Sequence, residues 1–452
     1  MASRLIESLA STEPLADLFT DESILRAMLD FEVALAIVES RSGIIPASAA
    51  RSIAAAANPE AFDTADLSRK SLRAGTPSIP LVKALTGLVQ AKDASAAAFV
   101  HRGATSQDVS DTALMLILKQ AQSLLESDLT HCENALRILS EQHKNSVMLG
   151  RTLLQPGPPT TFGLKAAGWL GAVRRGRERL THAFADALVL QFGGAVGTLA
   201  VLGEKGPAVA QELAAELGLA CPDAPWHTNR DRLGALVCAC GLLTGSLGKI
   251  ARDVSLLMQN EVGEAAEAAS EGRGGSSTMP HKRNPIGCTV AIAAATRMPG
   301  LVASYLTAML QEHERSIGGS QSEWPTVAAV IQTTGAAAAS LAEIVEGLTV
   351  DPMRMRRNID ETLGIVFAEK AMVLLAEKLG REKAHELLEA GVHKAVAKKC
   401  TLADALADIP EIMKVLDKTA LQKLTIAEDY LGSAESFRRE ILRGTSPTST
   451  KS

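Results

Sequence analysis

The side chains best suited to chemistry in this sequence gather in residues 272–287, a segment rich in glycine, serine and basic residues. The hydroxyls of Ser276 and Ser277 can exchange a proton, and Lys282 together with Asn284 can stabilise a developing anion. The glycines and prolines of the segment cannot continue a helix. This composition is compatible with a solvated hinge between two helices and with a mobile lid over a reaction site, so both interpretations stay open.

A second group of polar residues, within residues 101–112, stands at the predicted start of a helix. Thr105 is the expected N-cap and Asp108 follows three residues later, in the arrangement of a capping box. The backbone N–H groups and the positive dipole end of a helix start also attract carboxylates. The segment can therefore cap a helix, bind an anion, or do both, while His101 by itself is better explained as a packed structural histidine.

The elements that must position these residues are predicted to be helices. Aromatic residues make up only 3% of the chain while Ala, Leu, Glu and Lys abound, a usage that favours an all-α fold. Apolar residues recur at helical spacing in residues 21–42, before Gly43, and in residues 365–379, before Gly380. A further helix is predicted over about 382–399.

Long Ala/Leu-rich segments in the middle of the chain predict an oligomer. Residues 254–269 and 289–312 are expected to be helices that are apolar on more than one side. Such helices need neighbours on several sides, which a bundle formed by several subunits would supply. The polar residues 444–452, which lack apolar anchors, are expected to be a frayed tail.

Composition excludes several classes of function. Lys and Arg total 46 against 51 acidic residues, and the net charge of -5 gives no reason to expect a nucleic acid or a membrane surface as partner. The six cysteines form no C-x-x-C pair and the histidines no ligand-spaced cluster, so we expect no metal site and a reducing, cytoplasmic environment, with Cys238 and Cys240 as buried core thiols. No uninterrupted apolar run reaches the ~20 residues that span a bilayer, and the N-terminus lacks the apolar stretch of a secretory signal. We expect a soluble protein whose function lies in a local site.

Residues 275–285, Gly-Ser-Ser-Thr-Met-Pro-His-Lys-Arg-Asn-Pro, resemble the signature segment of the fumarase/aspartase superfamily. The resemblance extends over nearly the whole chain. It implies an all-α homotetramer, with no cofactor, whose sites draw residues from three subunits. It also implies three domains: an N-terminal helical domain in residues 1–111, a central long-helix bundle carrying the catalytic loop in 112–360, and a C-terminal helical domain in 361–452.

Carried over by position, the same resemblance assigns roles to individual residues. Ser276 would transfer the proton, and Lys282 and Asn284 would stabilise a dianionic aci-carboxylate intermediate. The remaining candidates would contact the substrate: His101, Thr105, Ser106, Arg151, Thr152, Gln155, Asn229, Ser277, Met279, Arg315 and Ser316. For Asn229 or Arg315 taken in isolation a solvated polar surface is the simpler explanation, although the guanidinium fork of an arginine suits a carboxylate.

Leu153 departs from the superfamily pattern. Residues 150–163 resemble a segment that usually reads Gly-Arg-Thr-His, in which the histidine assists the departure of an amine or hydroxyl. A carboxylate, whose conjugate acid has a pKa of about 4, leaves as a stable anion without such help. The loss of the histidine therefore favours the branch of the superfamily that lactonises 3-carboxy-cis,cis-muconate by adding a substrate carboxylate to a double bond. Other segments also resemble this branch: residues 78–85, 191–198, 226–232, 311–318 and 322–324.

That branch implies an intramolecular lyase, or cycloisomerase, of aromatic compound catabolism that acts on a small tricarboxylate in the protocatechuate branch of the β-ketoadipate pathway. An adenylosuccinate lyase-like enzyme of β-elimination is the alternative, although it would be expected to keep a histidine at position 153. A non-catalytic structural homologue is the third possibility, although it would be expected to lose Ser276, Lys282 and Asn284. The apolar residues 188–194 lack the glycine spacing and βαβ context of a dinucleotide site.

Overall fold

The structure, a computed structural model, describes residues 5–268, 279 and 282–444. The chain divides into two compact units, each assembled from three stretches of sequence. Unit 1 comprises Met1–Thr130, Arg175–Lys249 and Val290–Ser340. Unit 2 comprises His131–Arg174, Ile250–Thr289 and Leu341–Ser452.

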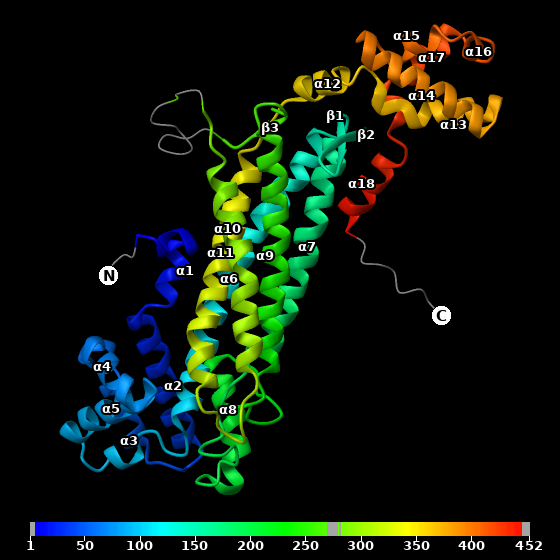
Figure 1. The fold of residues 1–452 in the computed structure, drawn as a ribbon. Coiled ribbons are helices and arrows are strands. Elements are labelled where there is room, and N and C mark those ends of the chain that lie inside the picture. Colours follow the sequence, from blue (N-terminus) through cyan, green and yellow to red (C-terminus); the bar gives the residue numbers. More distant parts are fainter. Residues whose placement is uncertain (1–4, 269–278, 280–281, 445–452) are drawn as a thin grey trace. The chain divides into compact units, whose positions relative to one another are not determined.

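The described residues are predominantly helical, as predicted, and the elements are labelled in Figure 1. The α-helices are α1 (Glu13–Leu18), α2 (Asp21–Arg41), α3 (Ala47–Ala56), α4 (Thr64–Ala74), α5 (Ser78–Lys92), α6 (Ser106–Gln142), α7 (Phe162–Ala187), α8 (Gly206–Leu217), α9 (Asp231–Leu257), α10 (Ile286–Ala308), α11 (Gly319–Glu346), α12 (Pro352–Asp360), α13 (Ala368–Leu379), α14 (Arg381–Lys398), α15 (Leu402–Ala407), α16 (Pro410–Met413), α17 (Lys418–Leu424) and α18 (Ala434–Arg443). Short 3-10 helices are η1 (Glu7–Ala10), η2 (Pro59–Ala61), η3 (Ala97–Phe99), η4 (Gly203–Lys205), η5 (Ile365–Phe367) and η6 (Ala427–Tyr430). The strands are β1 (Val147–Thr152), β2 (Gln155–Thr161), β3 (Ala265–Ala266) and β4 (Thr349–Val350).

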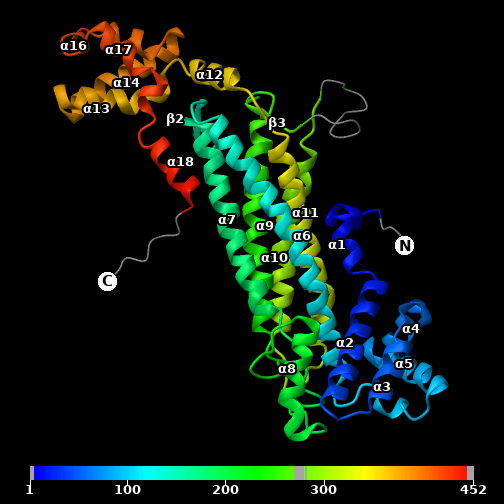
Figure 2. The ribbon, with the colours of Figure 1, turned by 180° about the vertical axis from the view of Figure 1, so that it is seen from behind.

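Within unit 1, segments of α6, α9, α10 and α11 lie side by side in both ribbon views (Figures 1 and 2). Small residues permit the close approach. A Cβ added at Gly248 of α9 would lie 2.3 Å from the Cβ of Ala295 in α10, and one added at Gly335 of α11 would lie 1.9 Å from Cδ1 of the buried Leu15. These helices are therefore packed with no space for an additional methyl group at the two glycines.

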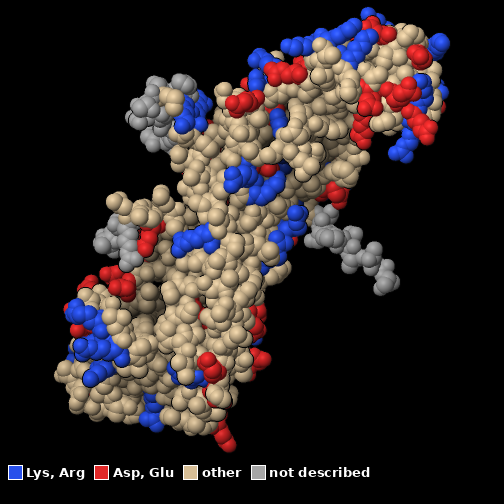
Figure 3. Space-filling view, in the orientation of Figure 1, with Lys and Arg blue, Asp and Glu red and all other residues tan. Residues whose placement is uncertain are grey.

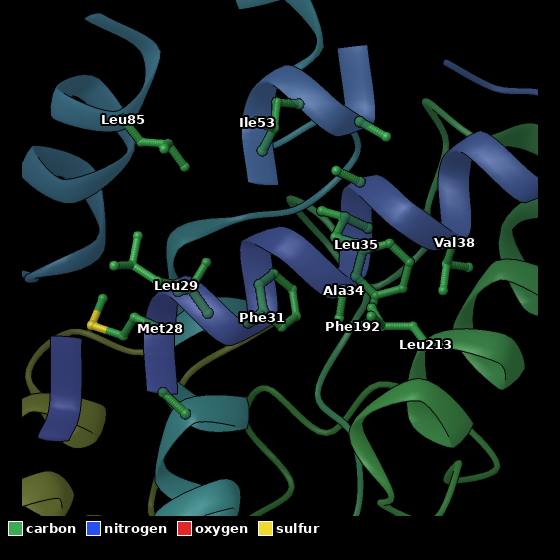
Figure 4. Close-up of a cluster of buried hydrophobic side chains, with 14 of the residues drawn as sticks. Met28, Leu29, Phe31, Ala34, Leu35, Val38, Ile53, Leu85, Phe192 and Leu213 are labelled. Carbon is green, nitrogen blue, oxygen red and sulfur yellow. The ribbon is translucent and has the colours of Figure 1, made fainter. Parts of the chain in front are cut away.

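A second apolar cluster of unit 1 is built around α2. Thr20 caps this helix by accepting a hydrogen bond from the N–H of Ser23, and Gly43, with φ of 65°, follows its end. Phe31 of α2 is fully buried, and Figure 4 shows it in one cluster with Leu213 of α8. The predicted helix over residues 21–42 is confirmed.

The C-terminal helices of unit 2 form a separate core. The predicted helix of residues 365–379 begins as the 3-10 turn η5 and continues as α13, and Gly380, with φ of 76°, separates it from α14. Leu375 of α13 and Leu406 of α15 are fully buried in this core. The predicted pair of helices is confirmed.

An antiparallel hairpin, β1–β2, was not anticipated by the all-α prediction. Val147 pairs with Thr161 at its base and Thr152 with Gln155 at its tip. The two-residue turn consists of Leu153 and Leu154, with φ of 51° and 65°. Both residues are in the left-handed region, where a non-glycine residue costs roughly 1–2 kcal/mol, and their side chains are 97% and 73% exposed.

The predicted helix over residues 254–269 was wrong. Helix α9 ends at Leu257, and the chain then turns through Gly263, with φ of 61°, into the short strand β3. Glu264 explains the departure, because its buried carboxylate binds Arg151 and its backbone carbonyl accepts from the N–H of Asp351. Tertiary contacts of one residue therefore override the apolar pattern of the segment. Residues 445–452 of the expected tail lie outside the described part of the chain.

Three described helices, α9, α10 and α11, are long and apolar enough to cross a membrane by length and composition alone. No uninterrupted apolar run of ~20 residues occurs in them, as the sequence indicated, but the mean hydropathy of an 18-residue window stays high despite the interrupting Thr, Ser and Gly residues. In the most apolar window of each helix, 61% of α9 and 67% of α11 is buried inside the protein but only 28% of α10, so α10 is the least buried of the three within one chain. Cys240 is buried as expected, whereas Cys238 is only half-buried.

We predict opposite effects of alanine at two helical glycines. Gly335→Ala should lower the free energy of unfolding by about 1–3 kcal/mol, because the added methyl group overlaps the packed Leu15 side chain. Gly87→Ala in α5, where the added Cβ meets nothing within 4 Å, should raise it by about 0.5–1 kcal/mol through helix propensity. Urea unfolding of both variants tests the packing, which equal effects of the two substitutions would contradict.

Candidate active site

A cavity of about 220 Å³ in unit 1 carries a single arginine. It is lined by Ala74, Gly75, Thr76, Ile79, Ser106, Gln107, Arg315, Ser316, Ser320, Gln321 and Trp324. Among these described lining residues only Arg315 bears a charge. Its Nη1 donates to Oγ1 of Thr105 at 2.8 Å and its Nη2 donates to Oγ of Ser106 at 3.3 Å.

The contacts of Arg315 orient the two hydroxyls. A guanidinium can only donate, so the oxygens of Thr105 and Ser106 accept, and each hydroxyl retains its own proton for another acceptor. Ser106 also begins α6, whose first turn supplies free N–H groups and the positive end of a helix dipole. The cavity therefore combines one cation with hydroxyl donors, an arrangement suited to a carboxylate.

A buried ion network lies beside this cavity. Nη1 and Nη2 of Arg230 donate to the two oxygens of Asp111 at 2.7 and 3.1 Å, and its Nε donates to Glu323 at 2.8 Å. All three side chains are fully buried. The indole of Trp226 covers the guanidinium at 4.5 Å. Burial would lower the pKa of Arg230, but the carboxylates of Asp111 and Glu323 raise it above its ordinary value, so the arginine stays charged.

Asp108 holds the loop that begins α6. Its carboxylate accepts from the N–H groups of Thr105, Gly193 and Gly194 at 2.9–3.1 Å and contacts Nε2 of His227 at 2.8 Å. The bond to Thr105 is the capping interaction that the sequence predicted. Gly193 and Gly194 end the segment 188–194, which lacks the features of a dinucleotide site, and the structure places them in a loop bound to Asp108.

His101 lies in a group of buried carboxyls. Its Nδ1 is 2.6 Å from Oε1 of Glu32, whose side chain has no exposed surface. Burial would lower the pKa of His101, but the carboxylates of Glu32, Asp108 and Glu39 raise it above its ordinary value. Glu39 is fully buried and, among the described residues, its two oxygens have no hydrogen-bond partner. Burial raises the pKa of Glu39 to about 8, against a smaller lowering effect of Arg102.

In unit 2 the arginine of the β1–β2 hairpin is paired. Nη1 and Nη2 of Arg151 donate to the two oxygens of Glu264 at 2.8 and 2.7 Å, and Nδ2 of Asn358 donates to the same carboxylate at 2.8 Å. This bidentate pair fixes the strand that leads to Leu153. The side chain at position 153 is directed into solvent, so this chain has at the hairpin tip an exposed leucine in place of an imidazole.

A larger cavity of about 970 Å³ in unit 2 is lined by two cations from the segment rich in glycine and serine. Its lining residues include Met279, Lys282, Arg283, Asn260 and Asp351. Glu267 stands just before that segment. Its carboxylate accepts from the N–H groups of Gly287 and Cys288 at 3.0 and 2.8 Å, so it fixes the start of α10, where the segment ends.

Comparison with known proteins decides the family. The chain matches the family model described as "Lyase" over residues 8–300 and the model "Adenylosuccinate lyase C-terminus" over residues 364–441. The 3-carboxy-cis,cis-muconate cycloisomerase of Bradyrhizobium diazoefficiens is 46% identical over 97% of this chain and 98% of that protein. The chain belongs to the lyase family of the fumarase/aspartase superfamily.

Further relatives in the family differ in name. The crystal structure of 3-carboxy-cis,cis-muconate lactonizing enzyme from Pseudomonas putida has a TM-score of 0.92 and 43% identity, with 98% of each chain covered. The nitrosuccinate lyase of Streptomyces davaonensis is 42% identical over 96% of this chain and 93% of that protein. The family and fold expected from residues 275–285 are thereby confirmed.

The structure brings together some of the residues expected at the site. Thr105, Ser106, Arg315 and Ser316 meet at the cavity of unit 1, while Met279 and Lys282 line the cavity of unit 2. Five others line neither cavity. His101 pairs with Glu32, Arg151 pairs with Glu264, Asn229 is exposed, and Thr152 pairs with Gln155 at the hairpin tip. Asn284 is half-buried, and its carbonyl accepts from the N–H of Ile286. Ser276 and Ser277 lie outside the described residues, so their roles stay predictions.

The residues that hold the site were missed. Segments 226–232 and 322–324 had been noted, but no role was given to Arg230, Asp111 or Glu323. One signal was available. Asp111 lies one helical turn after Asp108 and just before the apolar residues 113–118, a position at which a carboxylate is expected to be buried and to require a partner.

The buried Glu39 predicts a pH dependence of stability. The folded protein keeps a proton on this carboxyl between its ordinary pKa of 4.5 and about 8, whereas the unfolded chain releases it, so the free energy of unfolding falls as the pH rises through that window. His101, with its raised pKa, contributes in the same direction. Glu39→Gln should gain stability relative to the natural protein by on the order of 1 kcal/mol for each pH unit between 5 and 8.

Urea unfolding midpoints at pH 5, 6.5 and 8 measure this effect. Glu60→Gln, at an exposed glutamate, is the matched control and should follow the natural protein at each pH. Parallel profiles of Glu39→Gln and the natural protein would show that Glu39 ionises normally.

Proposed function

We propose that this chain converts 3-carboxy-cis,cis-muconate into a carboxymuconolactone by intramolecular addition of a carboxylate to a double bond. The observation that carries the proposal is 46% identity to a cycloisomerase of that name over nearly the full length of both chains. The similarity to the P. putida lactonizing enzyme, with a TM-score of 0.92, supports it. The reaction would place the protein in the catabolism of aromatic compounds.

The chemistry at the oxygen end supports the same reaction. The attacking group is a carboxylate that is already an anion, so no protein acid or base is needed there. Leu153 is consistent with this, since the hairpin tip carries an exposed apolar side chain and no proton carrier. At the carbon end, charge moves onto the conjugated carboxyl as an aci-carboxylate, and a proton must then be delivered to carbon.

The residues expected to act at the carbon end come from residues 276–284. In the proposed mechanism Ser276 delivers the proton, and Lys282 and Asn284 stabilise the aci-carboxylate. For the reverse direction Ser276 must act as an alkoxide, which requires cations and N–H donors around it. Lys282 and Arg283, which line one cavity, are cations of the required kind.

We also propose that the active protein is a cytoplasmic homotetramer with sites shared between subunits. The exposed surface of α10 supports the proposal, because only 28% of its most apolar window is buried within one chain. Arg297 is the only charged residue of this helix. In Figure 3 the surface over the long helices of unit 1 is mostly neither acidic nor basic, as expected of a face that helices of other subunits cover.

Nitrosuccinate elimination is the second candidate. The 42% identity to a nitrosuccinate lyase favours it, and nitrite, like a carboxylate, departs as a stable anion. Leu153 is therefore compatible with both reactions, and only the substrate distinguishes them.

Turnover of the two substrates tests the function. With 3-carboxy-cis,cis-muconate, the ultraviolet absorbance of the conjugated diene should disappear as lactone forms in equal amount, because addition breaks the conjugation. With nitrosuccinate no nitrite should be released. A flat absorbance trace together with nitrite release would establish the second candidate, and inactivity on both substrates would overturn both.

The proton carrier has its own test. Ser276→Ala should reduce kcat by about 10²–10⁴-fold, because the hydroxyl that protonates carbon is removed. Ser71→Ala in α4, whose hydroxyl bonds the carbonyl of Leu67, is the matched control and should retain kcat. Light scattering should find a tetramer for both variants. Near-normal turnover by Ser276→Ala would remove this residue from the mechanism.

A further inference from the structure

Gln107, in the wall of the unit 1 cavity, has a fixed amide orientation. Its Nε2 donates to Oδ2 of Asp111 at 3.0 Å and to the backbone carbonyl of His227 at 2.8 Å. A carboxylate and a carbonyl can only accept, so the amide nitrogen, and not the oxygen, must face them. Both amide hydrogens are thereby used, and Oε1 is the polar atom that Gln107 can present to the cavity.

The buried ion network prevents this amide from turning. Oδ2 of Asp111 accepts from Gln107 and from Nη1 of Arg230, while Oδ1 accepts from Nη2 of Arg230 and from Nε1 of Trp324. Rotation of the amide would place its oxygen against this carboxylate, with two acceptors in contact in a buried site. Gln107 is itself only 4% exposed, so no solvent shell would relieve the repulsion.

We propose that Gln107 is a specificity-determining residue that presents an obligate hydrogen-bond acceptor to the ligand, and that Asp111 is the residue that positions it. Among the described residues none donates a hydrogen bond to Oε1 of Gln107. The Arg315 end of the cavity attracts one carboxylate, whereas the Gln107 side repels a second anion and accepts from a proton-bearing neutral group. The cavity therefore takes a single carboxylate.

This inference deepens the proposed function and rests on it in one respect. A tricarboxylate substrate would place one carboxylate at Arg315 and direct the hydrocarbon chain past Gln107 and the apolar Trp324 and Ile79. The other two carboxylates would be bound by groups outside this cavity. Gln107 would thus select the orientation of the substrate, and the identity of the carboxylate at Arg315 would be fixed before reaction.

Three small ligands of similar size test the acceptor on the natural protein. Succinamate has one carboxylate and an N–H donor, monomethyl succinate has one carboxylate and a neutral acceptor, and succinate has two carboxylates. Calorimetric titration at pH 8 should find succinamate bound about tenfold more tightly than succinate, with the ester clearly weaker than the amide. Equal affinity for the amide and the ester would overturn the acceptor role, because both carry the same charge.

Two matched variants test whether the preference for succinamate over succinate comes from Gln107. Gln107→Met removes the acceptor and should reduce the succinamate-to-succinate preference to one or below. Gln321→Met removes another glutamine of the same cavity, whose Nε2 donates to the carbonyl of Gly75 at 3.2 Å, and should keep the preference. The reverse pattern would assign the preference to Gln321 and refute the proposal. If the protein turns over 3-carboxy-cis,cis-muconate but shows no preference for succinamate, the proposed function stands and the role of Gln107 is refuted. If it shows the preference but no turnover, the role of Gln107 stands and the proposed function is refuted.

Discussion

The buried contact between Arg230 and the carboxylates of Asp111 and Glu323 is the interaction on which the unit 1 site depends. A guanidinium without exposed surface is tolerable only with opposite charges and good hydrogen-bond geometry, and loss of one partner from such a group typically costs about 3–5 kcal/mol. The network joins α6, the residue before α9, and α11. Because Asp111 also binds Gln107 and Trp324, the same charges that hold these segments together fix the cavity wall.

Unit 2 uses buried carboxylates in the same way. Glu264 holds the hairpin through Arg151 and Asn358, and Glu267 holds the first residues of α10. Both carboxylates are buried, so their bonds are not weakened by competing water. In each unit, loops and strand ends that carry candidate site residues are attached to helices through acidic side chains that would be unstable without those contacts.

In the expected reaction the protein need not donate a proton at the oxygen end, whereas an ordinary lyase of the superfamily must protonate its leaving group. A carboxylate or a nitrite needs no protonation to depart, so the hairpin tip can carry Leu153 without loss of the reaction. The energetic demand falls instead on stabilising a second negative charge on an already anionic substrate. We propose that Lys282, which lines the unit 2 cavity together with Arg283, meets that demand.

The sequence by itself determined the helical fold, the ends of helices such as α2 and α13, the superfamily, and which segments carry chemistry, because periodicity, capping residues and a specific motif are local properties. It did not reveal that residues 254–269 leave the helix or that residues 147–161 form a hairpin, since the buried bonds of Glu264 decide the former and pairing across a two-leucine turn the latter. Only the tertiary structure showed that Asp111, Arg230 and Glu323, distant along the chain, share one charge network. The orientation of the Gln107 amide follows from that network, because which of its two ends faces a ligand depends on acceptors contributed by other segments.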